Sequence, residues 1–321
     1  MKYWRSFLVL VFLVVFGCHK KPTEPENGTQ DFPNRVIATI STEERPFHIA
    51  STPNGSYVYA THFLTVDSVS VIRTSDNTII REIPVGKDPY DLAVTPNGER
   101  LYVTNCASNE ISVIRTSDNT VVKTIPVDVV PFEIAISPNG DYAYISSWII
   151  LVLRLSDNIV VDSIDALYTN NALAITPDGN YIYVADNLND EVAVIRTSDN
   201  SVITKIDVGD WPEDIAVTPN GNLVYVANCG SSTISIIRTS DNTVIETIES
   251  IPAPNGIVFS SNGKYAFVAA GKEVSVIRTS DNKLVKSIDI SYRPSDIIIT
   301  PNQKYIYVTV PANDIITVIG Y

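Results

Sequence analysis

Short apolar segments with polar turns between them follow one another along most of the chain. Between the first two segments of one set, Gly98 closes a Pro-Asn-Gly turn, where glycine supplies a positive φ at no steric cost. Asp118 and Asn119 form the turn between the last two. A helical period of 3.6 is missing, so the pattern predicts antiparallel strands. This set of four strands comprises Asp91–Thr95, Arg100–Thr104, Ile111–Thr116 and Thr120–Val127.

The set repeats at intervals of about 40 residues, which is typical of solenoids and propellers. A β-solenoid would show shorter rungs, so we expect an all-β, seven-bladed β-propeller with four antiparallel strands in each blade. Turns of the Pro-Asn-Gly type begin at Pro53, Pro96, Pro138, Pro177, Pro219, Ser261 and Pro301. Thr-Ser-Asp-Asn turns begin at Thr74, Thr116, Thr197, Thr239 and Thr279, with a variant at Leu155.

The seventh unit ends at Tyr321 without a fourth strand. Near the start of the chain, Asn34–Ile40 matches Asn119–Ile125 of the second unit position by position. We therefore expect Val36–Ile40 to supply the outer strand of the last blade. Closing the ring in this way leaves no unpaired edge at the seam.

The two ends of the ring differ in how much they vary. The end with the Pro-Asn-Gly and Ser-Asp-Asn turns, which we call the turn end, is nearly identical from unit to unit. The other end, the loop end, carries the loops between strands two and three and the connections between blades. Tyr102 and Arg115 are 13 residues apart, whereas the equivalent Tyr144 and Arg154 are 10 apart. We expect a partner to bind the loop end, because rigid scaffolds carry function on variable loops.

One residue at the start of each first strand faces the mouth of the central channel at the loop end. Carboxylate and amide oxygens from several directions are what Ca²⁺ needs, so these residues are candidate ligands for Ca²⁺, another divalent metal or a cationic group. The alternative is structural: an aspartate two residues after Pro89, Pro212 or Pro294 caps a turn. In ring order the residues are His48, Asp91, Glu133, Ala172, Asp214, Gly256 and Asp296, with Asn171 and Asn255 beside them.

Aromatic side chains gather in the same loops. One interpretation is packing between blades. The other is a stacking platform for a sugar, a peptide or a cationic group. The residues are Phe47, Tyr90, Phe132, Trp148, Tyr168, Trp211 and Tyr292.

The first residues resemble a bacterial lipoprotein signal. Lys2 and Arg5 precede an apolar run, Phe7–Phe16, that is too short to span a bilayer, and Cys18 follows it. The resemblance implies cleavage before Cys18 and lipidation of its sulfur. The alternative is an ordinary signal peptide with a chance cysteine. We expect three parts: 1–17 as signal peptide, 18–34 as lipidated cysteine and flexible tether, and 35–321 as one propeller domain, exported and anchored in the bacterial cell envelope on its periplasmic or outer face.

Charge and composition narrow the function. Removal of residues 1–17 changes the net charge from −13 to −15, which argues against nucleic-acid binding. Cys106 and Cys229 occupy equivalent positions three repeats apart, too far apart for a disulfide. Beyond the tether only His48 and His62 could serve as bases, so nucleophilic catalysis has little support and we assign no catalytic residue.

The second strands carry a family resemblance. Leu101–Asn105 contains the string Tyr-Val-Thr-Asn, and variants occur at Tyr183–Asp186, Tyr225–Asn228 and Tyr307–Val310. The segment 35–321 resembles the YVTN-type β-propeller repeat family, which implies the propeller fold. That family includes surface proteins and proteins linked to quinone-cofactor enzymes, and some propeller lactonases hold a metal in a comparable mouth.

Three functional hypotheses follow. The preferred one is a non-catalytic binding scaffold, a monomer whose loop end captures a protein or carbohydrate of the cell envelope. The second is a metal-dependent, lactonase-like hydrolase that uses the carboxylates of the channel mouth. The third, by family analogy, is an accessory protein of a periplasmic redox system. Contact with a membrane is expected only through the lipid anchor.

Overall fold

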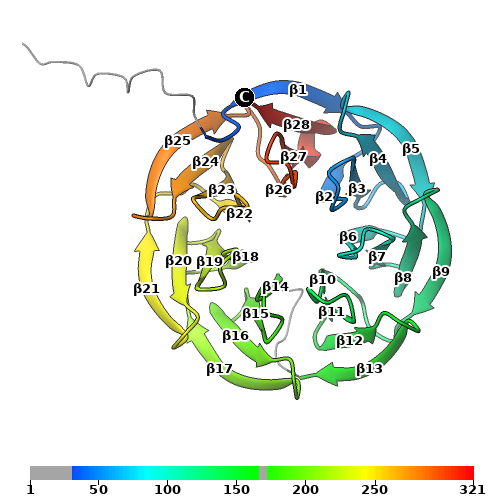
Figure 1. Ribbon diagram of the computed structural model, residues 1–321, viewed down its shortest axis with the longest axis horizontal. Helices are drawn as coiled ribbons and strands as arrows, with labels where there is room; N and C mark the ends of the chain where they lie inside the picture. The colour runs from blue at the N-terminus through cyan, green and yellow to red at the C-terminus, as the bar shows by residue number, and fades with distance from the viewer. Residues whose placement is uncertain (1–30, 166–171) are drawn as a thin grey trace, which may run out of the picture. The chain divides into compact units, whose positions relative to one another are not determined.

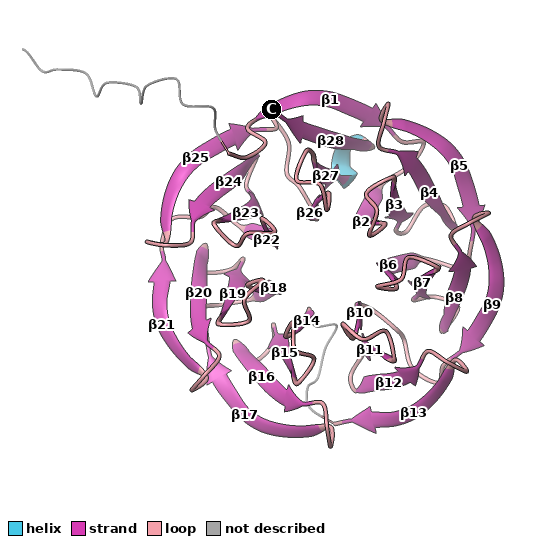
Figure 2. Ribbon diagram, in the orientation of Figure 1, coloured by secondary structure: helices cyan, strands magenta, loops and turns pink. Residues whose placement is uncertain are grey.

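Seven four-stranded antiparallel sheets circle a common axis (Figure 1). The computed structural model describes residues 31–165 and 172–321. In six sheets the strands pair in chain order, from the strand beside the axis to the strand at the rim, and in the seventh the N-terminal strand takes the place at the rim. Figure 2 shows that strands make up nearly all of the ring. The predicted seven-bladed propeller is therefore confirmed.

Blades are numbered here in chain order. Blades one to three are β2 (Pro46–Ser51), β3 (Tyr57–His62), β4 (Ser68–Arg73), β5 (Thr78–Pro84); β6 (Pro89–Val94), β7 (Arg100–Asn105), β8 (Glu110–Arg115), β9 (Thr120–Pro126); and β10 (Ile134–Ile136), β11 (Tyr142–Ser146), β12 (Ile150–Arg154), β13 (Ile159–Ile164). Blades four to six are β14 (Leu173–Ile175), β15 (Tyr181–Asp186), β16 (Glu191–Arg196), β17 (Ser201–Asp207); β18 (Pro212–Val217), β19 (Leu223–Asn228), β20 (Thr233–Arg238), β21 (Thr243–Ile248); and β22 (Pro254–Phe259), β23 (Tyr265–Ala270), β24 (Glu273–Arg278), β25 (Lys283–Asp289). Blade seven is β26 (Ile297–Ile299), β27 (Ile306–Val310), β28 (Ile315–Gly320) and β1 (Arg35–Ser41).

The N-terminal strand closes the seventh blade, as predicted. β1 pairs antiparallel with β28, from Arg35 opposite Gly320 to Ser41 opposite Ile315. The compact unit begins at Phe32, three residues before the expected boundary at 35. Phe32 is 6% exposed, and its ring lies 4.6 Å from that of Tyr265 and 6.0 Å from that of Phe267. The closure therefore includes a buried aromatic anchor as well as a strand.

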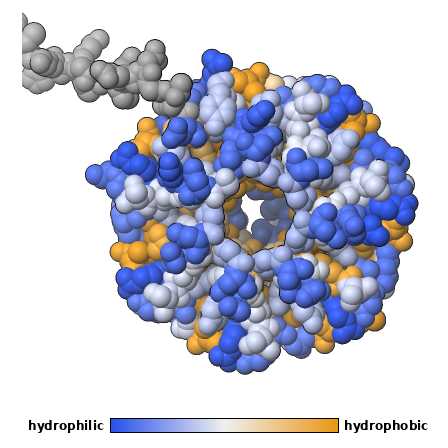
Figure 3. Space-filling model, viewed as in Figure 1, coloured by the Kyte–Doolittle hydropathy of each residue, from blue (hydrophilic) through white to orange (hydrophobic). Residues whose placement is uncertain are grey.

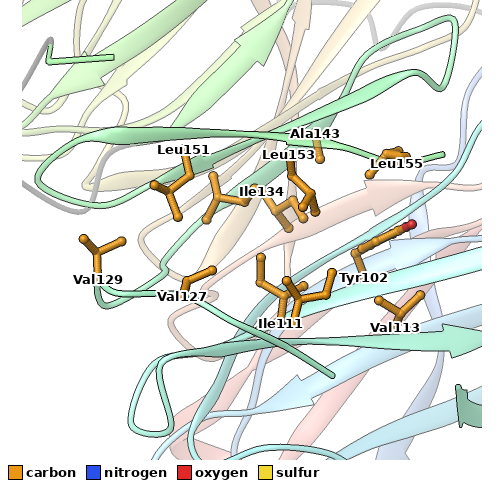
Figure 4. Packing of buried hydrophobic residues seen from close by; sticks show 12 residues of the cluster. Tyr102, Ile111, Val113, Val127, Val129, Ile134, Ala143, Leu151, Leu153 and Leu155 are labelled. Carbon is orange, nitrogen blue, oxygen red and sulfur yellow. The ribbon is translucent and has the colours of Figure 1, made fainter. Parts of the chain in front are cut away.

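The core lies between neighbouring sheets, where the middle strands are buried on both faces. In Figure 4, Ile111 and Val113 of blade two face Ile134 and Leu153 of blade three. In six blades strand four has one buried apolar residue, such as Ile125 in blade two, and is otherwise mostly exposed; in blade five the equivalent Ile248 is half-buried. Figure 3 shows the result on one face: a largely hydrophilic surface surrounds the central opening, and apolar surface lies toward the rim.

A tyrosine–asparagine hydrogen bond ties five of the seven blades to the next at the turn end. The tyrosine lies in strand two, and its hydroxyl donates to Oδ1 of the asparagine in the Ser-Asp-Asn turn of the following blade. These asparagines have φ between 54° and 59°, a region that asparagine tolerates better than most residues. The pairs are Tyr59–Asn119 (2.9 Å), Tyr102–Asn158 (2.8 Å), Tyr183–Asn242 (2.7 Å), Tyr225–Asn282 and Tyr307–Asn77 (2.5 Å).

Two local features differ from the sequence-based expectation. Strand one starts two residues earlier than expected in the blades that begin with Pro46, Pro89, Pro212 and Pro254, because the chain keeps pairing past an irregularity in register. A short 3-10 helix, η1 (Pro311–Asn313), occupies the strand two–three loop of blade seven. No helix in the described part of the chain is long and apolar enough to cross a membrane.

Candidate binding site at the channel mouth

A cavity of about 540 Å³ opens at the loop end of the ring axis. The structure brings six of the predicted mouth residues to its wall: His48, Asp91, Glu133, Asp214, Asn255 and Asp296. Phe47 and Tyr90 line it as well, together with Arg45, Glu213 and Arg293, which the sequence analysis did not single out. The predicted Asn171 and Tyr168 lie outside the described residues.

Hydroxyl groups of strand two position the mouth residues. The Thr104 hydroxyl accepts the N–H of Asp91 at 3.0 Å and donates to the carbonyl oxygen of Phe132 in the next blade at 2.5 Å. Thr61 and Thr309 make the equivalent pair of bonds in blades one and seven. The threonine of the Tyr-Val-Thr-Asn string thus holds the end of strand one and joins it to the neighbouring blade.

Three aspartates of the mouth bind backbone N–H groups across blade boundaries. Oδ2 of Asp91 accepts from Ile134 at 2.8 Å, Oδ2 of Asp214 from Ile257 at 2.6 Å, and Oδ2 of Asp296 from Ile49 at 2.9 Å. The last bond crosses the seam of the ring. Asp214 and Asp296 also accept the N–H of the residue that follows each of them, from Ile215 at 2.7 Å and from Ile297 at 2.6 Å. The structural alternative, in which these aspartates bind neighbouring backbone, therefore has an observed basis.

His48 lies between two of these carboxylates. Its Nδ1 is 3.6 Å from Oδ1 of Asp91 and 3.5 Å from Oδ2 of Asp296. Burial alone would lower the pKa of His48, but the charge of Asp91 and the contact with Asp296 outweigh burial and raise that pKa to about 10. His48 is therefore an imidazolium at neutral pH, which makes it a poor general base.

The remaining carboxyl groups of the mouth resist ionisation. Burial, together with the charge of Asp296, raises the pKa of Asp214 to about 8. Burial also raises the pKa of Asp91 and, more strongly, that of Glu133. Burial therefore favours the uncharged form of these carboxyl groups, so the opening carries less negative charge than their number suggests.

The geometry does not fit a preformed metal site. Among residues 31–165 and 172–321, no group of three or more His, Cys, Asp or Glu side chains is arranged to hold a metal ion. Asp91, Asp214 and Asp296 each already use one oxygen for a backbone N–H. We therefore derive no chemistry from a metal at this mouth.

The aromatic residues fall into two groups. Phe47, Tyr90 and Phe132 form a half-buried cluster beside the cavity, with Phe47 and Tyr90 at 5.2 Å and Tyr90 and Phe132 at 5.4 Å between ring centroids. Phe63, at 5.1 Å from both Phe47 and Tyr90, completes this cluster. Phe63 was not predicted because it lies just beyond strand two, in a loop that does not repeat from blade to blade. The second group, Trp148, Trp211 and Tyr292, is exposed.

Cys106 and Cys229 form no disulfide, as expected from their separation. Cys106 is buried, and burial raises the pKa of its thiol to about 12. Cys229 is only half-buried, and Nη2 of Arg293 lies 3.7 Å from its sulfur.

Comparison with known proteins supports the propeller fold. A family model described as a lactonase with a seven-bladed β-propeller matches residues 160–258, which is less than half of the chain. No protein of curated function matches the sequence. A solved structure of hydrazine synthase from Kuenenia stuttgartiensis superposes with a TM-score of 0.77 and 22% sequence identity, over 88% of this chain and 97% of that one. At this identity the likeness shows that the two chains share the propeller fold.

Proposed function

We propose that this protein is a non-catalytic binding module whose partner is held at the loop end of the propeller. The observation that carries the proposal is the cavity of about 540 Å³ at that end, lined by acidic, basic and aromatic side chains on a rigid ring. Its volume falls within the range of small-molecule and side-chain pockets. Loops on a rigid scaffold are the usual place for recognition.

We further propose that the module is exported and anchored through Cys18 in the bacterial cell envelope. The proposal rests on the apolar run Phe7–Phe16 and the cysteine that follows it. Two or more acyl chains would hold the protein durably on a membrane. Radiolabelled palmitate should enter the wild type but not the Cys18→Ala variant, and labelling of both or of neither would contradict the anchor.

A lactonase-like hydrolase is the second candidate, because the lactonase family model matches residues 160–258. Its weakness is chemical: His48 is held between Asp91 and Asp296, and these carboxylates already accept backbone N–H groups. An accessory role in a redox system stays a hypothesis, with no contact in the described residues that favours it.

A paired experiment separates binding from turnover. The full chain is first tested for hydrolysis of a panel of sugar and homoserine lactones with and without Ca²⁺ or Zn²⁺. Loop-end variants (Phe63→Ala and Glu133→Gln) and a turn-end variant (Glu99→Gln) then serve as baits in envelope extracts, and recovered molecules are purified for calorimetry. We expect no hydrolysis of any lactone. We expect the purified molecules to bind the wild type, to bind the Phe63→Ala and Glu133→Gln variants more weakly, and to bind the Glu99→Gln variant as they bind the wild type. Lactone turnover abolished by Asp91→Asn would overturn the proposal.

A further inference from the structure

The acidic excess of the chain is concentrated at the loop end. Acids outnumber bases by twelve to four in the described loops and blade connections there. The acids are Glu43, Glu44, Asp67, Asp88, Asp128, Glu133, Asp165, Asp190, Asp210, Glu249, Asp296 and Asp314. The bases are Arg45, Lys87, Lys272 and Arg293.

The turn end, by contrast, is nearly neutral. Six arginines that end third strands each pair with the aspartate of the adjoining Ser-Asp-Asn turn, with N–O distances of 2.5 to 2.7 Å. Glu99, Asp141 and Asp178 in the other turns are offset by Lys264 and Lys304. The two ends of the ring therefore differ in potential, and only the loop end attracts positive charge over a distance.

Large apolar side chains are exposed at the same end. Trp148, Leu188 and Trp211 belong to the loops of blades three, four and five, and they are 54%, 67% and 57% exposed. Leu64 of blade one and Tyr292, in the connection to blade seven, are exposed as well. Exposed aromatic groups surrounded by polar residues are characteristic of protein–protein interfaces.

Trp211 occupies a turn position that an aspartate fills in blade two, so the turn does not require an indole side chain. Trp211 has a φ of 53°, and its N–H donates to Oδ1 of Asp190 at 2.7 Å. The equivalent residue of blade two is Asp88, with a φ of 52° and a bond from its N–H to Oδ1 of Asp67 at 3.0 Å. Aspartate adopts this conformation more readily than tryptophan. A strained and exposed tryptophan at such a position is the kind of outlier that points to function.

We infer that the loop end docks a protein with a Lys- and Arg-rich surface, whose apolar side chains cover Trp148, Leu188 and Trp211. This inference rests on the proposed binding function and names the chemistry of the partner. A neutral glycan would stack on the indoles but leave the acidic excess uncompensated. A basic protein surface satisfies both features, because charge speeds its approach and the apolar contacts slow its release.

The first test uses the full chain and a fluorescent peptide of ten lysines, with binding followed by anisotropy. The double variant Asp210→Lys/Glu249→Lys changes two exposed acids of the loop end, and Glu99→Lys/Asp141→Lys is the matched control at the turn end. We expect the loop-end variant to weaken binding about tenfold and the control to change it less than twofold. Equal effects of the two variants would overturn the inference, provided that circular dichroism shows both to be folded.

The second test identifies the partner. Trp211→p-benzoylphenylalanine in the full chain, with Tyr142→p-benzoylphenylalanine at the turn end as control, is cross-linked in intact cells. We expect a protein cross-linked only from position 211, with a basic surface and an affinity that falls steeply between 50 and 300 mM salt. An acidic or neutral protein, a glycan or a lipid at that position would overturn the inference but leave the binding function standing. No cross-link from position 211 would contradict both.

Discussion

The hydrogen bond between Tyr102 and Asn158 offers a direct test of how neighbouring blades are held together. Tyr102 is 2% exposed, and its hydroxyl donates to Oδ1 of Asn158 at 2.8 Å. Tyr102→Phe keeps the ring in the core and removes only this bond. We expect a loss of about 1 kcal/mol of unfolding free energy, because water reaches the turn and replaces part of the bond.

Asn158→Ala should cost more than Tyr102→Phe. It removes the same bond and also places alanine at a φ of 59°, a conformation that asparagine adopts more readily than alanine. Asn158→Gly separates the two contributions, because glycine accepts that φ without strain. The double variant Tyr102→Phe/Asn158→Gly should then be only about as unstable as the less stable of its two parents.

Equilibrium urea unfolding of Phe32–Tyr321 measures these differences, and a double-mutant cycle gives the coupling energy. Blade six supplies the control, because Phe267 stands where the tyrosine would be and blade seven has no Ser-Asp-Asn turn to receive a hydroxyl. Phe267→Tyr should therefore destabilise the ring, since its hydroxyl would be buried without that acceptor. A coupling energy near zero for Tyr102 and Asn158, or a stabilising Phe267→Tyr, would refute the reasoning.

Three further predictions concern closure and charge. Phe32→Ala should lower the unfolding free energy by about 3 kcal/mol, because a buried ring that contacts Tyr265 and Phe267 is lost. A thermal melt measures the change, and the midpoint of the control variant Glu43→Ala should equal that of the wild type. Deletion of residues 32–41 should leave β28 with an open edge and produce aggregates in light scattering, whereas a soluble particle no larger than the wild type would argue against closure by β1. Folding raises the pKa of His48 from 6.5 to about 10, so the stabilising contribution of the charged imidazole is complete below pH 6.5 and is lost as the pH rises through 10. Folding also raises the pKa of Asp214 to about 8, so stability falls as the pH rises from 4 to 8, where the unfolded chain ionises this carboxyl group and the folded chain does not. Melting temperatures should therefore fall from pH 5 to pH 10, and Asp214→Asn should melt above the wild type at pH 9 but not at pH 5.

Much of the fold could be predicted because each blade repeats its own turn chemistry. Seven Pro-Asn-Gly-type turns fix the number of blades, and the match of Asn34–Ile40 to a fourth strand fixes the closure. The ring geometry also explains why residues as distant in sequence as His48 and Asp296 could be placed at one mouth.

The arrangement of the site could be predicted only in part. The position of a residue in the repeat shows whether its side chain lies near the axis, but it does not show which groups that side chain contacts there. The hydrogen bonds of Asp91, Asp214 and Asp296 to the next blade depend on how two neighbouring blades are placed against each other, and the sequence of a single repeat does not determine that placement. Phe63, Arg45 and Arg293 escaped notice because they lie in the loops with the least repetition.

The pairing of Arg35 with Gly320 has a consequence for biosynthesis. The seventh blade can form only when both segments are available, so a ribosome must have passed Gly320 first. Until then β1 has no partner and the nascent product stays recognisable to chaperones and proteases. Premature termination before β28 would therefore yield a molecule destined for degradation, not a smaller working ring.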